Sequence, residues 1–183
     1  MLSHGPKNIA LTGFMAVGKT VVGRKLARRL KWDFVDLDRA IELAEAMKVK
    51  EIFKQKGEGF FRRLEKQKLS EVLEREGQVV ATGGGAIVDE ENLRLVKERS
   101  LLICLTATPQ TLMRRSGSGR GRPLLQGEED RKSKIEALLK QREKFYAQAH
   151  LVIDTGDLSI DGVVDKILEQ IRMIEGAVRI GRS

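Results

Sequence analysis

The sequence predicts an α/β fold in which a five-stranded parallel sheet lies between two layers of helices, a three-layer αβα sandwich. Two observations predict it. Five apolar runs of strand length recur along the chain, each followed by a segment of helical periodicity, which is typical of parallel strands joined by helical crossovers. A glycine-rich loop also separates the first run from its helix, where sheets of this type bind phosphate groups. The runs cover residues 9–11, 34–37, 79–81, 101–105 and 151–153.

The chain of 183 residues is expected to form one domain, residues 1–183, because this length can bury a substantial core. Its hydrophobic content of 41% and charged content of 33% are ordinary for a soluble protein, and no apolar run is long enough to span a membrane. No secretory signal precedes the first strand, so we expect a cytoplasmic protein. The single cysteine, Cys104, lies in the fourth run and is expected to pack in the core.

The formal net charge of +8 would suit a nucleic-acid-binding protein. The aromatic residues are few, however (six Phe, one Trp and one Tyr), and no motif for stacking on bases or reading a groove is present. Residues 114–144 contain ten Lys or Arg against five Asp or Glu, so this window supplies +5 of the charge. Such a segment near a phosphate-binding loop more simply serves anionic small molecules. We therefore expect neither a nucleic-acid partner nor a membrane partner.

The first element of the sheet leads into a phosphate-binding P-loop. Residues 13–20 read Gly-Phe-Met-Ala-Val-Gly-Lys-Thr and stand between the first apolar run and a helical stretch over 21–30. The two glycines let main-chain N–H groups turn inward around an anion, and the helix N-terminus adds its dipole. Lys19 can reach β- and γ-phosphate oxygens, and the Thr20 hydroxyl can ligate Mg²⁺. The expected nucleotide-binding residues here are Gly13, Ala16, Val17, Gly18, Lys19 and Thr20.

The second run ends in two acidic residues, Asp36 and Asp38. Because side chains alternate along a strand, both are expected to point to the same side, at the edge where the P-loop opens. One carboxylate can hold the hydration shell of Mg²⁺, and the other can accept a proton from a substrate hydroxyl. The alternative is that Asp38 caps a helix beginning near Arg39, which leaves Asp36 unexplained.

Residues 39–75 are expected to form a helical segment beside the site, with helices over 40–48 and 49–56. Gly57 and Gly59 interrupt the helical pattern before an apolar stripe resumes. Arg62 and Glu65 lie three residues apart on one helix face, so the carboxylate can orient the guanidinium. The residues alone leave open an exposed pair that contributes little.

Three glycines follow the third run, at Gly83, Gly84 and Gly85. They suit close contact between main-chain N–H groups and a ligand oxygen, and the alternative is a plain turn.

Residues from about 115 to 127 are mostly small, with arginines among them. This composition predicts a mobile lid that closes over phosphates, although a disordered surface loop has the same composition. A helix over about 128–149 and a last helix over 159–174 follow. Residues 176–183 are expected to be frayed.

Taken in order, these motifs resemble those of the shikimate kinases, and the resemblance spans roughly residues 7–170. It implies a nucleoside-monophosphate-kinase-like fold with strand order 2-3-1-4-5, a monomer, and transfer of the ATP γ-phosphate to the 3-hydroxyl of shikimate. The matching patterns are Gly-Phe-Met-x-x-Gly-Lys-Thr, Asp36-x-Asp38, Gly57-Glu58-x-x-Phe61-Arg62-x-x-Glu65, Thr82-Gly83-Gly84-Gly85, Arg122-Pro123-Leu124-Leu125 and Arg142-x-x-x-Tyr146.

The resemblance also implies roles for single residues. Arg62 and Arg142 would grip the shikimate carboxylate, with Glu65 holding Arg62 in place. Asp38 would bond the ring hydroxyls and act as base or orienter, and the glycines at 83–85 would close that pocket. From the lid, Arg122 would reach the phosphates, and Arg115 would lie against adenine. A cation fork for a carboxylate and acceptors for hydroxyls suit an anionic polyol.

Two positions depart from the family pattern, which often has glycine where Ala16 stands and a hydroxyl residue where Val21 stands. Neither departure removes a phosphate ligand, although Ala16 constrains the loop. A kinase of another small polyol acid such as gluconate is the nearest alternative, but it would not need the acidic pair, Arg62 and the three glycines together. A nucleotide-dependent switch would need a guanine-reading Asn-Lys-x-Asp, which is missing from the sequence. A nucleic-acid-binding ATPase is a weaker alternative still.

Overall fold

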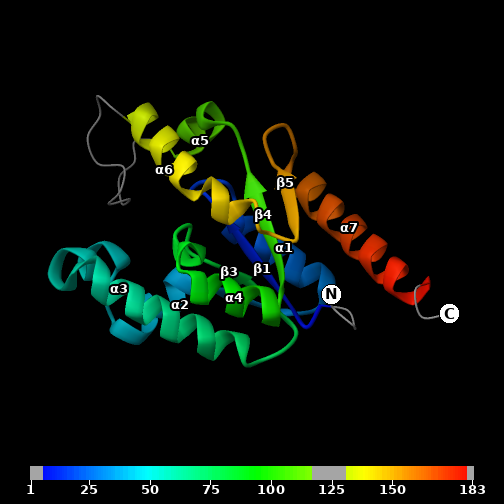
Figure 1. The fold of residues 1–183 in the computed structure, drawn as a ribbon, viewed down its shortest axis with the longest axis horizontal. Helices are drawn as coiled ribbons and strands as arrows, with labels where there is room; N and C mark the ends of the chain where they lie inside the picture. Colours follow the sequence, from blue (N-terminus) through cyan, green and yellow to red (C-terminus); the bar gives the residue numbers. More distant parts are fainter. Residues whose placement is uncertain (1–5, 117–130, 181–183) are drawn as a thin grey trace.

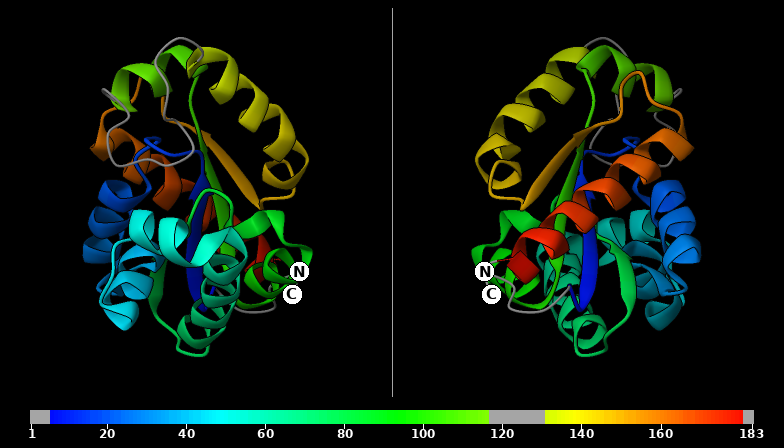
Figure 2. Two further views of the ribbon diagram at one scale, coloured as in Figure 1. Left: turned by 90° about the vertical axis from the view of Figure 1, so that its left-hand side faces the viewer. Right: turned by 90° about the vertical axis from the view of Figure 1, so that its right-hand side faces the viewer.

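A computed structural model describes residues 6–116 and 131–180 and confirms the predicted three-layer α/β fold (Figures 1 and 2). The described residues form a five-stranded parallel sheet in the order β2-β3-β1-β4-β5, the order that the resemblance implied. The strands are β1 Asn8–Gly13, β2 Asp33–Asp36, β3 Gln78–Ala81, β4 Leu101–Thr106 and β5 Leu151–Asp154. Because β1 is the middle strand, the loop that follows it lies at the edge of the sheet between the ends of β3 and β4.

Helices cover both faces of the sheet. The helical elements are α1 Lys19–Leu30, α2 Leu37–Glu45, α3 Val49–Leu73, η1 Ala86–Val88, α4 Glu90–Arg99, α5 Pro109–Ser116, α6 Arg131–Tyr146 and, after the last strand, α7 Ile160–Ile180. Side chains of β1 alternate between two apolar cores: Ile9 and Leu11 join one core with α1 and α7, whereas Ala10 joins the other with α2, α3 and α4. Both faces of the central strands are therefore buried.

Cys104 packs in the second of these cores, as predicted. Its side chain is fully buried, and this burial raises the pKa of the thiol to about 12. The thiol therefore stays neutral, as a packing residue should.

The boundary between β2 and α2 differs from the prediction. The strand ends at Asp36 and the helix begins at Leu37, so Asp38 lies in the first helical turn and not on the strand. The alternation argument for the acidic pair is therefore wrong. Farther on, the predicted interruption at Gly57 is confirmed, since its φ of 80° and ψ of 169° kink α3, whereas Gly59 stays helical.

The predicted frayed end is wrong for residues 176–180, because α7 continues through Gly176 to Ile180. A single glycine costs a helix only about 1 kcal/mol relative to alanine, which the rest of a long helix offsets. Residues 181–183, and residues 117–127 of the predicted lid, lie outside the described part of the chain.

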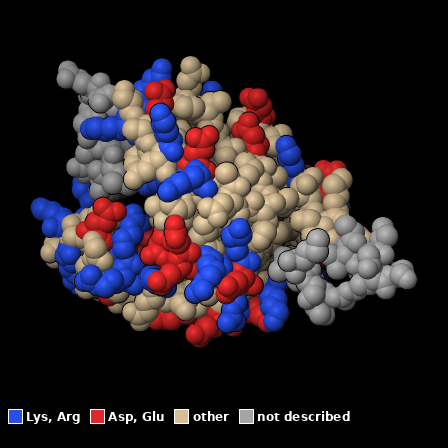
Figure 3. All heavy atoms as spheres, viewed as in Figure 1, with Lys and Arg blue, Asp and Glu red and all other residues tan. Residues whose placement is uncertain are grey.

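The surface is mixed in charge. Acidic and basic side chains are interspersed over most of the face drawn in Figure 3. Within the described ranges, no helix is both long enough and apolar enough to cross a membrane.

Candidate active site

The P-loop joins β1 to α1 in a conformation that its glycines permit. Gly13 has a φ of 132°, and a Cβ there would lie 2.2 Å from the carbonyl oxygen of Leu105. Gly18 precedes α1 with a φ of 106°. Ala16 also takes a left-handed φ of 65°, which a residue with a Cβ rarely adopts. The predicted constraint at Ala16 is thus visible as backbone strain inside the loop.

Lys19 lies over the P-loop at the start of α1. Its ammonium group donates hydrogen bonds to the carbonyl oxygens of Gly13 at 2.8 Å and Phe14 at 3.1 Å. These contacts hold the positive charge at the loop where phosphates bind in nucleotide sites of this kind.

Thr20 and Asp36 bring two hard oxygen donors together beside the loop. The Thr20 hydroxyl donates a hydrogen bond to Oδ2 of Asp36 at 2.7 Å. The other carboxylate oxygen of Asp36 accepts from the main-chain N–H of Arg39 at 3.3 Å and caps α2. The capping alternative therefore applies to Asp36 and not to Asp38, because the helix begins two residues earlier than expected.

One cavity of about 580 Å³ brings most of the predicted residues together. It runs from the P-loop past the acidic pair to the glycine loop, defined here as Gly83–Gly84–Gly85, and to α3 and α6. Its walls include Ala16, Gly18, Lys19, Thr20, Asp36, Asp38, Phe53, Phe61, Arg62, Glu65, Gly83, Gly84, Gly85 and Arg142. A phosphate site and an acceptor pocket are thus continuous.

Asp38 projects into this cavity from the first turn of α2. Solvent reaches the residue, yet the surrounding walls reduce its hydration and raise the pKa of its carboxyl, while Lys19 opposes the rise and Asp36 adds to it. A carboxylate whose proton affinity is raised in this way is suited to accept a proton from a hydroxyl.

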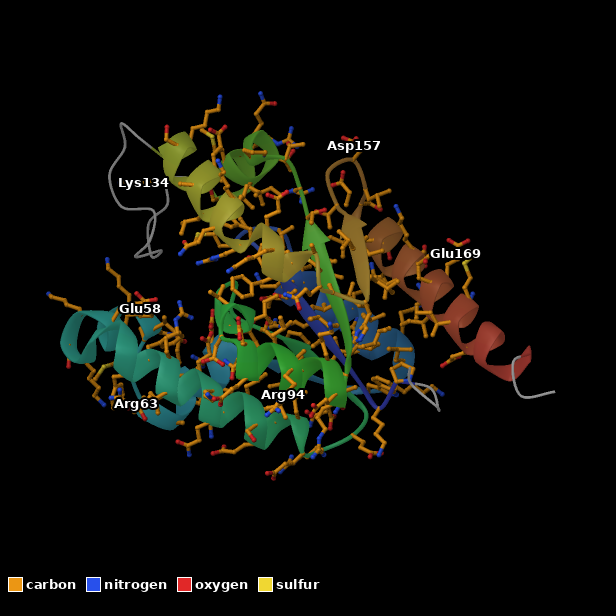
Figure 4. The ribbon with its side chains drawn as sticks, in the orientation of Figure 1. Glu58, Arg63, Arg94, Lys134, Asp157 and Glu169 are labelled. Carbon is orange, nitrogen blue, oxygen red and sulfur yellow. The ribbon has the colours of Figure 1, made fainter. Side chains whose placement is uncertain are left out.

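Arg62 is held by carboxylates on two sides. Its Nη1 donates to Glu65 at 2.6 Å, and its Nε and Nη2 donate to Glu58 at 3.2 and 3.0 Å. Glu65 is only 1% exposed, so the alternative of an exposed surface pair is wrong. Burial alone would lower the pKa of Arg62, but the two carboxylates raise it. Figure 4 shows Glu58 on the side of α3 that faces α6, and Arg63 on the opposite side.

Glu65 itself has one oxygen that no described group satisfies. Its Oε2 accepts from Arg62, whereas Oε1 is buried without a hydrogen-bond partner among the described residues. Burial raises the pKa of its carboxyl, and the charge of Arg62 opposes that rise. Glu65 therefore fixes the guanidinium from a position that sequence spacing alone did not reveal as buried.

The glycine loop contains glycines because a side chain would lie too close to neighbouring groups, and not because its backbone needs an unusual conformation. None of the three adopts a positive φ. A Cβ on Gly83 would lie 2.5 Å from Oε1 of Glu65, and one on Gly85 would lie 2.8 Å from Nη2 of Arg62. These glycines are therefore explained by the close approach of the loop to charged side chains, and their contact with a ligand oxygen stays a prediction.

Arg142 enters the cavity from α6 and is 6% exposed. Its guanidinium lies 5.7 Å from the ring centre of Phe14 in the P-loop, which links the acceptor end of the cavity to the phosphate end. One turn later, the Tyr146 hydroxyl donates to the carbonyl oxygen of Gly84 at 2.8 Å. Sequence reasoning noted Tyr146 only as part of a motif and gave it no role.

Three of the predicted residues that the structure describes, Gly13, Val17 and Arg115, do not line this cavity. Arg115, at the end of α5, donates to the hydroxyl and carbonyl oxygens of Thr155 at 2.9 and 2.7 Å and so ties α5 to the loop after β5. Its predicted contact with adenine stays a prediction. Arg122 lies outside the described residues.

The donors near the P-loop fit Mg²⁺ better than a transition metal. No group of three or more His, Cys, Asp or Glu side chains gathers in the described ranges. Thr20 and Asp36 offer only hard oxygen atoms, which suit a Mg²⁺ ion that keeps water and phosphate ligands.

A P-loop, a carboxylate with a raised pKa and two arginines within one cavity are the site of a kinase that phosphorylates a small anionic alcohol. The model of the family "Shikimate kinase" matches residues 15–172. Shikimate kinase of Thermoanaerobacter pseudethanolicus is 40% identical over 171 residues, covering 93% of this chain and 99% of the relative. Shikimate kinase of Moorella thermoacetica is 44% identical over 167 residues, covering 91% and 95%.

The solved structures agree with these relatives. Shikimate kinase from Acinetobacter baumannii in complex with shikimate has a TM-score of 0.89 and 36% identity, covering 92% of this chain and 94% of that one. A gluconokinase from Sinorhizobium meliloti has a TM-score of 0.62 and only 15% identity, so it shares the fold alone. The chain belongs to the shikimate kinase family and is an ATP-dependent kinase.

Proposed function

We propose that this shikimate kinase transfers the γ-phosphate of ATP to the 3-hydroxyl of shikimate through the residues of the 580 Å³ cavity. The observation that carries the proposal is the continuity of that cavity, which joins the P-loop to a pocket with one suitable base and two guanidinium groups. Such continuity lets a hydroxyl approach the γ-phosphate in line.

Arg62 and Arg142 bind the shikimate carboxylate. Both guanidinium groups line the same end of the cavity, and Arg62 is already oriented by Glu65. The glycine loop supplies main-chain N–H groups at this end without side chains that would obstruct the acceptor. A neutral sugar alcohol would offer these two guanidinium groups no negative charge, whereas the shikimate carboxylate does.

Asp38 accepts the proton of the reacting hydroxyl. It faces Lys19 across the cavity, so its carboxylate lies between the acceptor pocket and the P-loop. Lys19 then stabilises the charge that develops on the transferring phosphoryl group. We assign a further charge-stabilising role to Arg122, by resemblance, from outside the described residues.

The nucleotide binds on the P-loop residues Gly13, Ala16, Val17, Gly18, Lys19 and Thr20, with Arg115 beside the adenine. Thr20 and Asp36 would hold the accompanying Mg²⁺, which would offset the negative charge of the phosphates. Their side chains already lie in mutual contact, which supports a shared ligand.

The enzyme is further proposed to act as a monomer in the cytoplasm, without nucleic acid or membrane. The P-loop, the acidic pair and both arginines that the proposal uses are residues of this chain, which supports a site that one copy can form. ATP as co-substrate is consistent with an intracellular enzyme.

An ADP-release assay with shikimate, quinate and gluconate side by side tests the acceptor. Shikimate should support turnover at micromolar to millimolar concentration, the ordinary range for KM, and gluconate should support little above background. Equal turnover with gluconate would overturn the acceptor assignment while leaving the P-loop kinase intact. Phosphorus NMR of the product identifies which hydroxyl carries the phosphate.

A further inference from the structure

Tyr146, the single tyrosine of the chain, lies just behind the acceptor pocket. It is on α6, one turn after Arg142, and is 7% exposed. Its hydroxyl donates to the carbonyl oxygen of Gly84 at 2.8 Å, while the Arg142 guanidinium lies beside the same hydroxyl. The proposed chemistry uses Arg142 and the glycine loop but assigns nothing to this phenol.

The carbonyl that Tyr146 holds belongs to the peptide unit between Gly84 and Gly85. In a trans peptide the C=O and N–H groups point in opposite directions, so fixing the carbonyl also fixes the N–H of Gly85 away from Tyr146. Gly85 lines the cavity and approaches Arg62 so closely that a Cβ would lie 2.8 Å from Nη2. The phenol thus controls the orientation of a peptide at the acceptor end.

Gly84 is also the point where the glycine loop meets two other parts of the site. A Cβ on Gly84 would lie 3.0 Å from the carbonyl oxygen of Gly13 in the P-loop and 3.2 Å from Nη1 of Arg142. The same Gly13 oxygen accepts a hydrogen bond from Lys19. A Cβ at Gly84 would be tight against both groups, so a displaced Gly84 would disturb Arg142 or the P-loop.

The phenol remains a donor at neutral pH. Burial raises the pKa of Tyr146 to about 12, against the smaller opposing effect of Arg142. A neutral phenol can donate to the Gly84 carbonyl, whereas a phenolate could not.

We propose that Tyr146 is a positioning residue for the acceptor: its hydrogen bond to Gly84 sets the glycine loop at the spacing from Arg142 that the substrate carboxylate requires. Arg142 and Tyr146 are four residues apart on α6. The same rigid helix therefore carries the guanidinium and the phenol that holds the glycine loop. The inference deepens the proposed function and rests on its assignment of the acceptor pocket.

Tyr146→Phe tests the inference because it keeps the ring and removes only the hydroxyl. The KM for shikimate should rise roughly five- to twentyfold, the size expected for one buried hydrogen bond, while kcat and the KM for ATP stay within about twofold. Ser100→Ala is a matched control, since the buried Ser100 hydroxyl also donates to a main-chain carbonyl, that of Val96 at 2.6 Å, at the opposite end of the sheet. It should lower Tm comparably and leave all kinetic constants unchanged.

An unchanged KM for shikimate in Tyr146→Phe, or equal rises in the KM for both substrates, overturns the positioning role. Arg62→Lys tests the proposed function separately, because it should raise the KM for shikimate whether or not Tyr146 positions the loop. A raised KM in Arg62→Lys with an unchanged KM in Tyr146→Phe would overturn only the role of Tyr146. If Tyr146→Phe does not fold, 3-fluorotyrosine can label this one position. A fluorine resonance that moves when shikimate alone is added supports the inference, and an unmoved resonance overturns it.

Discussion

The Thr20 hydroxyl donates a hydrogen bond to Oδ2 of Asp36 at 2.7 Å, although Thr20 is the second residue of α1 and Asp36 is the last residue of β2. The contact brings the two proposed Mg²⁺ ligands together. Asp36 uses its second oxygen to cap α2, and the first turn of that helix carries Asp38 into the cavity. One carboxylate therefore lies at the proposed metal site and also caps the helix that carries the proposed base.

Asparagine variants of the two acidic residues should fail in different ways. Asp36→Asn keeps a good helix cap but weakens the Mg²⁺ site, so its turnover should recover in part with excess Mg²⁺. Asp38→Asn cannot take up a proton, so its turnover should fall by roughly 10² or more and should not recover with Mg²⁺. Turnover measured against Mg²⁺ concentration for both variants gives the comparison. The same degree of metal rescue in both would show that the two roles are shared or reversed.

Lys19→Met should leave the fold intact and abolish phosphoryl transfer. The ammonium acts mainly on charge that develops in the transition state, so turnover should fall by roughly 10³. The substitution also removes the two hydrogen bonds to P-loop carbonyls, and a small decrease in Tm is expected. Circular dichroism and single-turnover kinetics check the two effects. Near-normal turnover in a folded variant would exclude Lys19 from the reaction.

Gly85→Ala should weaken acceptor binding without unfolding the protein. The new methyl group would meet Nη2 of Arg62, the flexible end of a side chain, which can move away. The KM for shikimate should then rise roughly tenfold or more, because about 1.4 kcal/mol of binding energy corresponds to a factor of ten. Gly59→Ala is the control: this glycine is helical, and a Cβ there approaches Arg63 only to 4.0 Å.

The control should stabilise α3 by up to about 1 kcal/mol and leave the KM unchanged. Steady-state kinetics with thermal unfolding on the same samples separates the two substitutions. A higher KM in Gly59→Ala, or an unaltered one in Gly85→Ala, would contradict the close-approach explanation of the glycine loop.

Asp38→Asn should also raise the thermal stability at alkaline pH. The folded-state pKa of Asp38 is raised above 3.8, so the folded state disfavours its carboxylate at pH values above that raised pKa. This penalty fades as the pH falls through the folded pKa and is absent below the unfolded one. Tm of the variant minus Tm of the parent should therefore be larger at pH 8 than near pH 4. If the Tm of the variant minus the Tm of the parent is instead larger at pH 4 than at pH 8, Asp38 stabilises the fold as a carboxylate.

Much of the fold and several site residues could be predicted because their signals are local. A P-loop is a contiguous stretch whose glycines, lysine and threonine act within one turn of chain, and five alternating apolar runs indicate a parallel sheet directly. The strand order needed the resemblance to a family. Asp38 was placed at the correct edge of the sheet, but by a strand argument that is wrong, because nothing in the residue pattern marks Leu37 as the first residue of a helix.

Other features depend on segments that are distant in the chain. Residues 62 and 65 look like an exposed helix pair until the glycine loop covers Glu65 and leaves it 1% exposed. Tyr146 reaches Gly84, which is 62 residues away, and no spacing rule links two such positions. Local patterns report propensity and periodicity, which each segment carries alone. Burial, the close approach of charged side chains and the hydrogen bond of Tyr146 arise only when the packed sheet brings separate segments together, because these interactions belong to pairs of segments and to neither one by itself.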